Sequence, residues 1–556
     1  MVVGNALAML TTSILAFDPR IDAYTRLIGQ GARFIYSDAV ETAADVKVPT
    51  LMKELAKIRA GLTNISIPTF DENEGDDRKQ NEVVALANLA PFPNAADECG
   101  RWREGEDEEA TVAASLTIPY PENRATLDYG PRSRRYSDEA LEDLVFSGLG
   151  QYRVQRIDPG DTTKPTGAVY AVYLNFAASF EVRPGFARLG ADAYFDGEKK
   201  ILAIARGGRL YRPDGPQGTP ERCTTKFFVT RCTPGVVGWL HAKLAFKGTL
   251  VGMVTLIDHL IGAHLSTGNL MATANIEHLP ADHALRRLLS PFSYGSASRD
   301  SNAGTLLARE HAAAQRALPL TTEGMRQVYR HANFTSATAS LESPPERLAR
   351  RGTADLHLPY DVDGLDYHAL LRNLTRSYVR LYYEHGARDG TASAPDGAVG
   401  APDACAADER VTEWYAAASS LLTRSSRLPS LSCASLAEVL ASLLFDVSAQ
   451  HQHVGSIGSE IRDPCFAPPS WREGELCGPP RTSFVTVLII ALTQDEVPTI
   501  DQDFSHLLLD ERAKRLWADF RASLAGLGAR VDARNRNRRL PFHLFRPRTL
   551  TSSISY

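Results

Sequence analysis

The sequence predicts a mainly α-helical protein built around a long buried helix, with a small subregion of β-strands. From residue 236 onward the hydrophobic pattern is predominantly helical, and Leu250–Ile261 carries a single charge, so its helix should be buried nearly all round. Ahead of it, Ala168–Leu174 and Lys200–Ala205 are strand-like runs that predict a small flanking sheet. With 44% hydrophobic and 23% charged residues, the chain has enough apolar material for a large core.

These elements are expected to fall into two parts, an N-terminal extension over residues 1–135 and one large domain over residues 136–556. The extension mixes short helical pieces with acidic runs at Asp71–Asp77 and Glu104–Glu109, which are typical of solvated loops. Its apolar opening, Met1–Phe17, lacks the basic residues of a signal peptide and is too short to cross a bilayer. We therefore expect a helix packed on the protein there.

The charge and the cysteine content limit which partners and which cellular compartment we expect for the protein. A net charge of −5 lacks the basic footprint of a nucleic-acid-binding protein. The seven cysteines include two closely spaced pairs, Cys223 with Cys232 and Cys465 with Cys477, which would close short loops in an exported protein. In a chain of this length we expect free thiols instead. The cytoplasm is therefore the favoured location, with secretion as the open alternative.

Histidines are concentrated in one segment of the predicted helical domain. Five of the 14 histidines fall within residues 241–283, and His259 and His264 are five residues apart in the apolar helix. On an α-helix this spacing puts two side chains about 140° apart, so both face one partner only where the helix widens, as a π-type bulge does. Neutral imidazoles suit iron and zinc, no cysteine lies nearby, and the spacing differs from the H-E-x-x-H motif of zinc proteases. Together with His451 and His453 downstream, the pair predicts a buried transition-metal site.

The stretch Trp239–Leu289 resembles the iron-binding core of lipoxygenases. In that family a W-x-x-A-K element precedes the first ligand histidine by twenty residues, as Trp239 precedes His259, and an H-x4-H pair and an H-L-P-x-x-H-x-L block follow. Five later blocks resemble the family's remaining segments in the same order: Leu358–Leu365, Tyr378–Tyr383, Ser448–His451, Ala467–Arg472 and Arg534–Tyr556. The resemblance covers about three quarters of the chain, from Tyr136 to Tyr556. It implies a bacterial-type lipoxygenase catalytic domain without an N-terminal β-barrel, with candidate lid helices in residues 1–135.

Carried over to this chain, the resemblance implies a four-ligand metal site. His259, His264 and His451 would be the imidazole ligands, and the C-terminal carboxylate of Tyr556 would be the anionic one. The family usually ends in Ile, but the coordinating group belongs to the backbone. A carboxylate would compensate the charge of the metal beside three neutral imidazoles. The implied cofactor is one mononuclear non-haem iron, and the same ligand set leaves manganese open.

One further ligand position of the family is altered in this chain. The family places Asn or His four residues after the third histidine, where this chain has Gly455, which offers no side chain. The amides that support this ligand in many family members are replaced as well, by Gly458 and Thr255. His453 and Ser456 are therefore kept as secondary candidates for metal ligands, in case the register of the helix shifts.

The resemblance implies a dioxygenase that acts on a 1,4-diene of a polyunsaturated fatty acid or a related polyene. Iron would take a hydrogen atom from the doubly allylic carbon, O2 would add to the radical, and a hydroperoxide would result. Leu256, Leu260 and Ile261 would line an apolar substrate channel. Two alternatives stay open: a lipoxygenase-related hydroperoxide isomerase or specialised-metabolite oxidase, and a non-catalytic metal-binding relative. The expected partners are the lipid or polyene substrate and O2, without nucleic acid. A monomer is expected, and peripheral contact with a membrane is left open.

Overall fold

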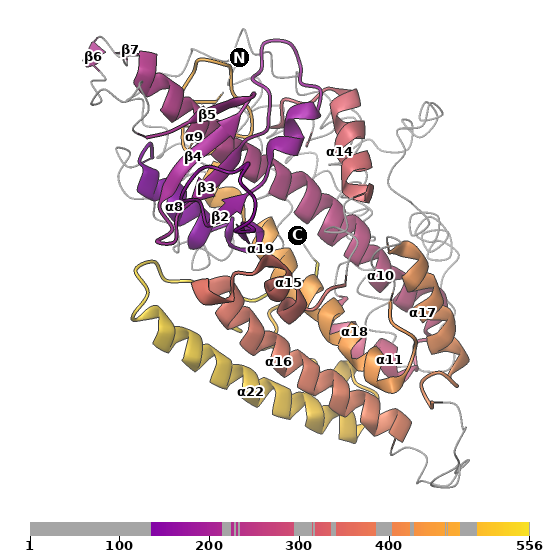
Figure 1. Ribbon diagram of the computed structural model, residues 1–556. Coiled ribbons are helices and arrows are strands. Elements are labelled where there is room, and N and C mark those ends of the chain that lie inside the picture. The colour runs from indigo at the N-terminus through magenta and orange to yellow at the C-terminus, as the bar shows by residue number, and fades with distance from the viewer. Residues whose placement is uncertain are drawn as a thin grey trace, which may run out of the picture.

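The computed structural model describes residues 135–213, 224–226, 229–231, 234–293, 314, 317–334, 341–384, 403–422, 428–461, 463, 465–478 and 498–554. Within these ranges a small sheet lies at one end of a large body of helices (Figure 1), and the predicted mainly α fold is confirmed. The predicted lid helices, the acidic runs, the apolar opening of the chain, Cys223 and Cys232 all lie outside the described residues.

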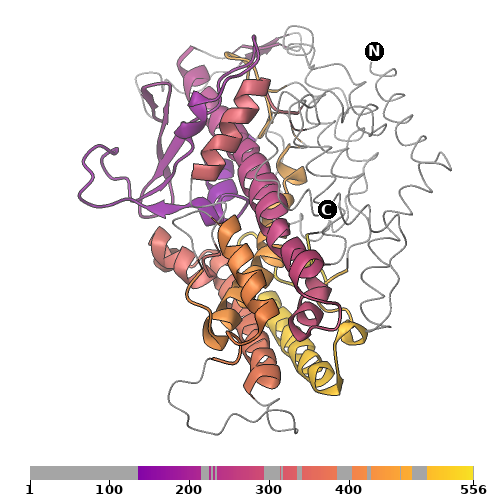
Figure 2. The same ribbon diagram turned by 90° about the vertical axis from the view of Figure 1, so that its right-hand side faces the viewer.

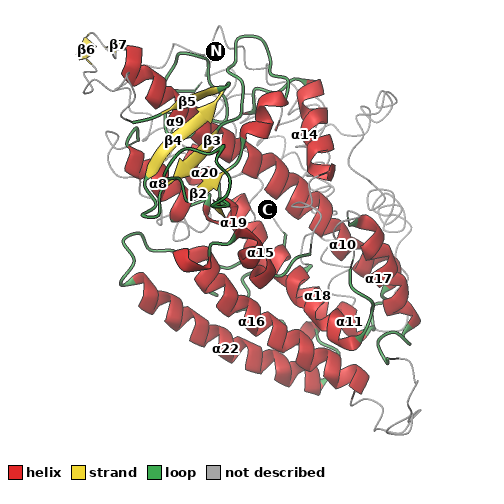
Figure 3. Ribbon diagram, in the orientation of Figure 1, coloured by secondary structure: helices red, strands yellow, loops and turns green. Residues whose placement is uncertain are grey.

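The sheet is antiparallel, and its five strands follow one another in chain order (Figure 3). They are β1 (Gln155–Arg156), β2 (Tyr170–Val172), β3 (Asp192–Phe195), β4 (Ile201–Arg206) and β5 (Arg209–Tyr211). Both predicted strands are confirmed, because β2 lies inside Ala168–Leu174 and β4 covers most of Lys200–Ala205. A separate hairpin joins β6 (Thr224–Lys226) to β7 (Val229–Arg231). The helix α8 (Asp138–Phe146) packs against β4.

One helical rod runs through the molecule from the sheet to the opposite end (Figure 2). It consists of α9 (Pro234–Met253), the π-helical η6 (Val254–Thr267), α10 (Gly268–Ala272) and the π-helical η7 (Thr273–His278). The residues at these junctions keep right-handed helical backbone angles, so the rod is continuous. This confirms the predicted long buried helix.

The start of the rod is fixed by one carboxylate at the beginning of α8. The indole Nε1 of Trp239 donates to Oδ1 of Asp138 at 2.9 Å, and Nζ of Lys243 lies 2.6 Å from the same oxygen. Trp239 and Lys243 are one turn apart and both are buried, so they reach Asp138 from the same side of α9. The W-x-x-A-K element therefore connects the central rod to the segment that precedes the sheet.

A second composite helix crosses the rod near its middle. It consists of α18 (Cys433–Phe445), the π-helical η14 (Asp446–Gln450) and α19 (His451–Gly455), and α19 packs directly against η6. Outside it lie α16 (Pro359–Val379), which continues into the π-helical η11 (Arg380–Glu384), and α22 (Glu511–Asn535), side by side in Figure 1. The other α-helices of the described residues are α11 (Ala284–Leu289), α14 (Thr322–Phe334), α15 (Pro344–Arg351), α17 (Glu409–Leu421) and α20 (Gly458–Ile461).

Two of the described helices are long and apolar enough to cross a membrane by composition, Gly238–Asn275 and Cys433–Gly455. Most of each apolar window, 83% and 78%, is buried inside the protein. Both helices carry histidines of the predicted metal site on their buried lengths. Their apolar character is therefore accounted for by the core that they form.

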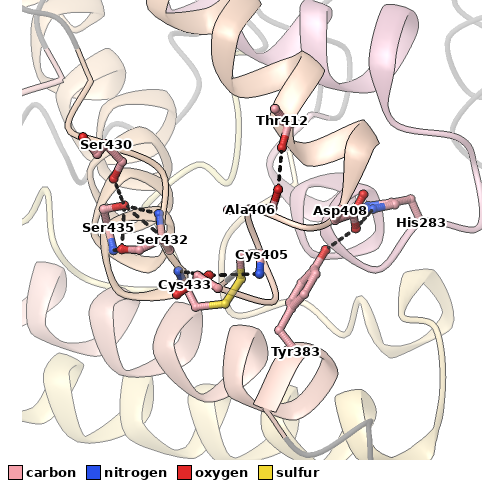
Figure 4. Close-up of a disulfide and its surroundings, with 11 residues drawn as sticks. His283, Tyr383, Cys405, Ala406, Asp408, Thr412, Ser430, Ser432, Cys433 and Ser435 are labelled. Carbon is pink, nitrogen blue, oxygen red and sulfur yellow. Dashed lines mark hydrogen bonds and ion pairs between the residues drawn. A yellow bond between two sulfur atoms is a disulfide. The ribbon is translucent and has the colours of Figure 1, made fainter. Parts of the chain in front are cut away.

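Two disulfides join cysteines that we expected as free thiols, so that expectation is wrong for four of the seven. Cys465 pairs with Cys477 across a short loop, and Cys405 pairs with Cys433 at the start of α18. Figure 4 shows the second disulfide. The carboxylate Oδ1 of Asp403 accepts from the backbone N–H groups of Cys405 and Cys433, at 3.0 and 2.9 Å. This contact holds the two segments together, and spacing along the chain does not show it.

Candidate metal centre

The first two histidines of the site lie on a widened helix, as their spacing predicted. The whole of η6 is π-helical, and the backbone N–H of Gly268 donates to the carbonyl of Ala263, five residues earlier. A π-helical turn takes more residues than an α-helical one, so side chains five apart return to nearly the same face. The Nε2 atoms of His259 and His264 are 3.1 Å apart.

His451 reaches this pair from the second composite helix. It is the first residue of α19, directly after the π-helical η14, and its side chain is fully buried. Its Nε2 lies 3.3 Å from Nε2 of His259, and the imidazole rings of His264 and His451 are 5.0 Å apart between centroids. The structure therefore brings together the three histidines that the sequence assigned to one site, although 187 residues separate His264 from His451.

The surroundings of the three rings favour neutral imidazoles. His264 and His451 are 2% and 0% exposed, and His259 keeps some exposed surface. Desolvation by the surrounding protein, with a smaller contribution from His264, lowers the pKa of His259 well below its ordinary value. The neutral form is the one that binds metal ions, because protonation removes the ligating lone pair.

The geometry of the three donors fits a single metal ion. Their ligand atoms all lie within 4.8 Å of one another. Two nitrogens bound to one ion at about 2.1 Å, and at right angles to each other, lie about 3 Å apart. The Nε2–Nε2 separations of 3.1 and 3.3 Å match that arrangement. A second described group, Asp403 with Cys405 and Cys433, is no comparable site because its sulfurs form a disulfide.

The predicted fourth ligand, the carboxylate of Tyr556, lies outside the described residues. The described chain ends two residues earlier, and Ser553 and Ile554 are both completely buried there. Thr551 forms an antiparallel bridge with Thr499, and the N–H of Ile500 donates to the carbonyl of Leu550 at 2.8 Å. The approach to the C-terminus is thus an ordered, buried segment.

The secondary candidates His453 and Ser456 have other surroundings. His453 lies outside the histidine group and between aromatic rings, with centroid distances of 4.5 Å to Tyr360 and 5.3 Å to Tyr152. Burial lowers the pKa of His453 to about 3. The hydroxyl of Ser456 donates to the carbonyl of Gln452 at 2.6 Å. Positions two residues apart point to opposite sides of a helix, which explains why His453 faces away when His451 faces the site.

The positions that depart from the family pattern also have clear surroundings. Gly455 is buried at the last position of α19, and Gly458 opens the short α20. The hydroxyl of Thr255 donates to the carbonyl of Val251 at 2.7 Å, one turn earlier in the same helix. The three predicted channel residues are at most 2% exposed and belong to the main hydrophobic core: Leu256, Leu260 and Ile261. Their role as a channel lining stays a prediction.

A charged network beside His259 was not found by sequence reasoning. Asp258 is the single charge in Leu250–Ile261, and its carboxylate accepts from Nε of Arg153 at 2.7 Å and from the hydroxyl of Tyr152. Burial and the Asp258 carboxylate raise the pKa of Tyr152 well above its ordinary value. The available signal was a charge in an otherwise apolar helix, but its partners lie more than a hundred residues away in sequence.

With this geometry in place, the fold defines the class of protein that the chain resembles. No protein-family model matches the chain, and no curated protein matches its sequence. Solved structures do match, and those compared here are lipoxygenases, so the predicted lipoxygenase-like fold is confirmed.

Three of these structures illustrate the likeness. A coral 8R-lipoxygenase is 15% identical over 95% of this chain and 75% of its own, with a TM-score of 0.62. A calcium-dependent 11R-lipoxygenase is 17% identical over 82% of this chain and 70% of its own, with a TM-score of 0.60. The variant Delta413-417:GS LOX, in a complex with arachidonate, is 15% identical over 92% of this chain and 82% of its own, with a TM-score of 0.62. At such identities the likeness shows the fold alone.

Proposed function

We propose that this protein is a lipoxygenase-like non-haem iron dioxygenase, which adds O2 to a 1,4-diene of a polyunsaturated fatty acid or a related polyene. The observation that carries the proposal is the convergence of His259, His264 and His451 at the crossing of two buried helices within a lipoxygenase-like fold. The arachidonate complex of a structural neighbour supports the substrate class.

In the proposed mechanism, the three histidines hold iron and the carboxylate of Tyr556 completes the ligand set. When bound, such an iron would take one electron from the substrate as a doubly allylic C–H bond loses its hydrogen, and would return that electron, with a proton, to the peroxyl radical that O2 forms on the carbon, which gives the hydroperoxide. The protein contributes a buried site, in which His264 and His451 are almost completely shielded from solvent. Leu256, Leu260 and Ile261 lie within three residues of His259 in sequence and would orient a hydrocarbon chain.

Metal analysis combined with an oxygen electrode tests the proposal. We expect about one iron per chain and O2 uptake with linoleate or arachidonate, giving a conjugated hydroperoxide that absorbs in the ultraviolet. Absence of metal from protein refolded or expressed with iron would contradict the proposed site. Bound iron without O2 uptake on either fatty acid would contradict the proposed reaction.

A second candidate function follows from Gly455. A metal with one protein ligand fewer leaves a further position open, which suits an enzyme that isomerises hydroperoxides or oxidises a specialised polyene. The isomerase predicts consumption of a fatty-acid hydroperoxide without O2 uptake. The same preparation distinguishes the two reactions, because one consumes O2 and the other does not.

We also propose that the protein matures in an oxidising compartment, contrary to the cytoplasmic location that the sequence favoured. Two disulfides among the described cysteines support secretion or export, since disulfides form and persist where thiols are not kept reduced. Alkylation and peptide mapping of protein from its native host under non-reducing conditions should show Cys405 joined to Cys433 and Cys465 joined to Cys477. Alkylated thiols at these four positions would contradict the proposal.

A further inference from the structure

Gln452, the residue after His451, connects the metal-bearing helix to the end of the chain. Its side chain is 1% exposed and makes two hydrogen bonds with one backbone segment. The amide Nε2 donates to the carbonyl of Thr549 at 2.6 Å, and Oε1 accepts from the N–H of Thr551 at 2.6 Å. The amide therefore binds this backbone segment in both directions, with its NH2 group as the donor and its oxygen as the acceptor.

The segment that Gln452 holds is the approach to the C-terminus. Its residues are buried from Thr549 to Ile554. On another side the segment pairs with residues 498–500, since the N–H of Ile500 donates to Leu550 and the N–H of Ser552 donates to the carbonyl of Pro498 at 3.0 Å. Ser555 and Tyr556 follow Ile554, and two residues of extended backbone span roughly 7 Å. Fixing Thr551 therefore limits where the carboxylate is able to lie.

We propose that Gln452 is a positioning residue that sets the C-terminal carboxylate relative to His451. His451 and Gln452 are neighbouring residues of α19. The two hydrogen bonds of the Gln452 amide therefore link the position of the His451 ring to the position of the C-terminal segment. This inference rests on the proposed function, in which the Tyr556 carboxylate binds iron. It adds a residue that supports that ligand without contacting the metal, and such supports commonly affect metal affinity 10- to 100-fold.

Gln452→Met tests the role, because methionine has a similar shape and lacks both hydrogen-bonding groups. Anaerobic titration of the metal-free full chain with Fe²⁺ gives the affinity. We expect Gln452→Met to weaken Fe²⁺ binding about 10- to 100-fold. In a chain that lacks Tyr556, the same substitution should weaken Fe²⁺ binding no further, because the group that Gln452 positions is already missing.

The matched control is Gln151→Met. Gln151 is also fully buried, and its amide also clamps backbone in both directions, donating to Gly148 at 3.1 Å and accepting from the N–H of Tyr360 at 2.9 Å. It does not contact the C-terminal segment through these bonds, so we expect a similar loss of thermal stability with Fe²⁺ affinity unchanged. If Gln452→Met does not fold, Gln452→Asn replaces it, because Asn keeps the amide on a shorter side chain. Its Fe²⁺ affinity is then compared in the full chain and in the chain that lacks Tyr556.

Three results would overturn the inference. Unchanged Fe²⁺ affinity in Gln452→Met, or an equal loss in Gln151→Met, would show that Gln452 serves only overall stability. Additive losses from Gln452→Met and the Tyr556 deletion would show that Gln452 acts on the site independently of the tail. Failure of the unaltered chain to bind Fe²⁺ would instead contradict the proposed function, and the inference with it.

Discussion

Two helix pairs in this protein are held together by different physical means. Where η6 meets α19, three neutral histidines converge in a buried space. Where α16 meets α22, the fully buried carboxylate of Asp363 binds Arg534 at 2.7 Å and Arg538 at 2.6 Å. The second pair compensates its buried charge within the protein. The first pair brings uncharged nitrogen ligands to one point, an arrangement that could hold a metal ion.

The two helix pairs also differ in their backbone geometry. Asp363 and Arg534 lie in α-helix, in α16 and α22, and Arg538 follows the end of α22. By contrast, His259 and His264 lie in the π-helical η6, and the π-helical η14 directly precedes His451. The π-helical turns cost regular hydrogen bonding but aim side chains that α-helical spacing would separate. We infer that the first pair is shaped for binding and the second for stability, and the following substitutions test this division.

The largest effect is expected from His259→Ala. It removes the ligand that lies within 3.3 Å of both other imidazole nitrogens, so bound metal and any metal-dependent activity should be lost. His241→Ala is the matched control, because His241 is also a buried histidine of the same rod but lies outside the group. Inductively coupled plasma mass spectrometry of the purified variants measures the difference. Full iron occupancy in His259→Ala would refute the assignment.

Asp363→Asn should destabilise the protein without changing the metal site. Removing one partner of a buried ion pair commonly costs about 3–5 kcal/mol, and here the guanidinium group of Arg538 loses the carboxylate that it binds at 2.6 Å. Asp366 also pairs with Arg534, at 2.6 Å, but its side chain is 32% exposed, so Asp366→Asn should cost less than about 1 kcal/mol. Urea unfolding followed by circular dichroism compares the two. Equal losses, or a change in iron content, would contradict the separation of roles.

A smaller, pH-dependent effect is expected at His368 on α16. Its ring is 3% exposed, and burial lowers its pKa to about 4. Because the unfolded chain binds this proton more readily, stability is complete above pH 6.5 and falls as the pH drops from there toward 4. Near pH 4.5 the loss attributable to this residue is roughly 2–3 kcal/mol. His368→Leu should flatten this part of the stability profile in thermal melts. An unchanged slope between pH 6.5 and 4.5 would show that His368 is not the group responsible.

The parts of this structure that sequence reasoning predicted are those that repeat within a few turns. The five-residue spacing of His259 and His264 predicted the widened helix, because only local geometry was needed. His451 entered through resemblance to a family, since no periodicity connects it to the other two. The bond between Gln452 and Thr549 was missed for the same reason. Its partners lie about a hundred residues apart and meet only through the packing of the whole domain.

The smallest effect is expected from Gly455→Asn, which sharpens the question of what the altered ligand position means. The substitution offers the metal an amide oxygen but supplies nothing to orient it. The hydroxyl of Thr255 already donates to Val251 at 2.7 Å, and Gly458 has no side chain, so neither position holds an amide partner. We therefore expect Fe²⁺ affinity and the electron paramagnetic resonance signal of the ferric protein to change little.

A triple variant provides the contrast to this single change. Adding Thr255→Gln and Gly458→Gln restores both supporting amides, and oriented ligands are commonly worth 10- to 100-fold in metal affinity or activity. Only the triple variant should alter the ferric signal and tighten Fe²⁺ binding. A large spectral change in Gly455→Asn alone would mean that the site orients a new ligand without supporting side chains. In that event the rigid packing of α19 against η6, rather than hydrogen bonding around the ligands, would control the geometry of the metal.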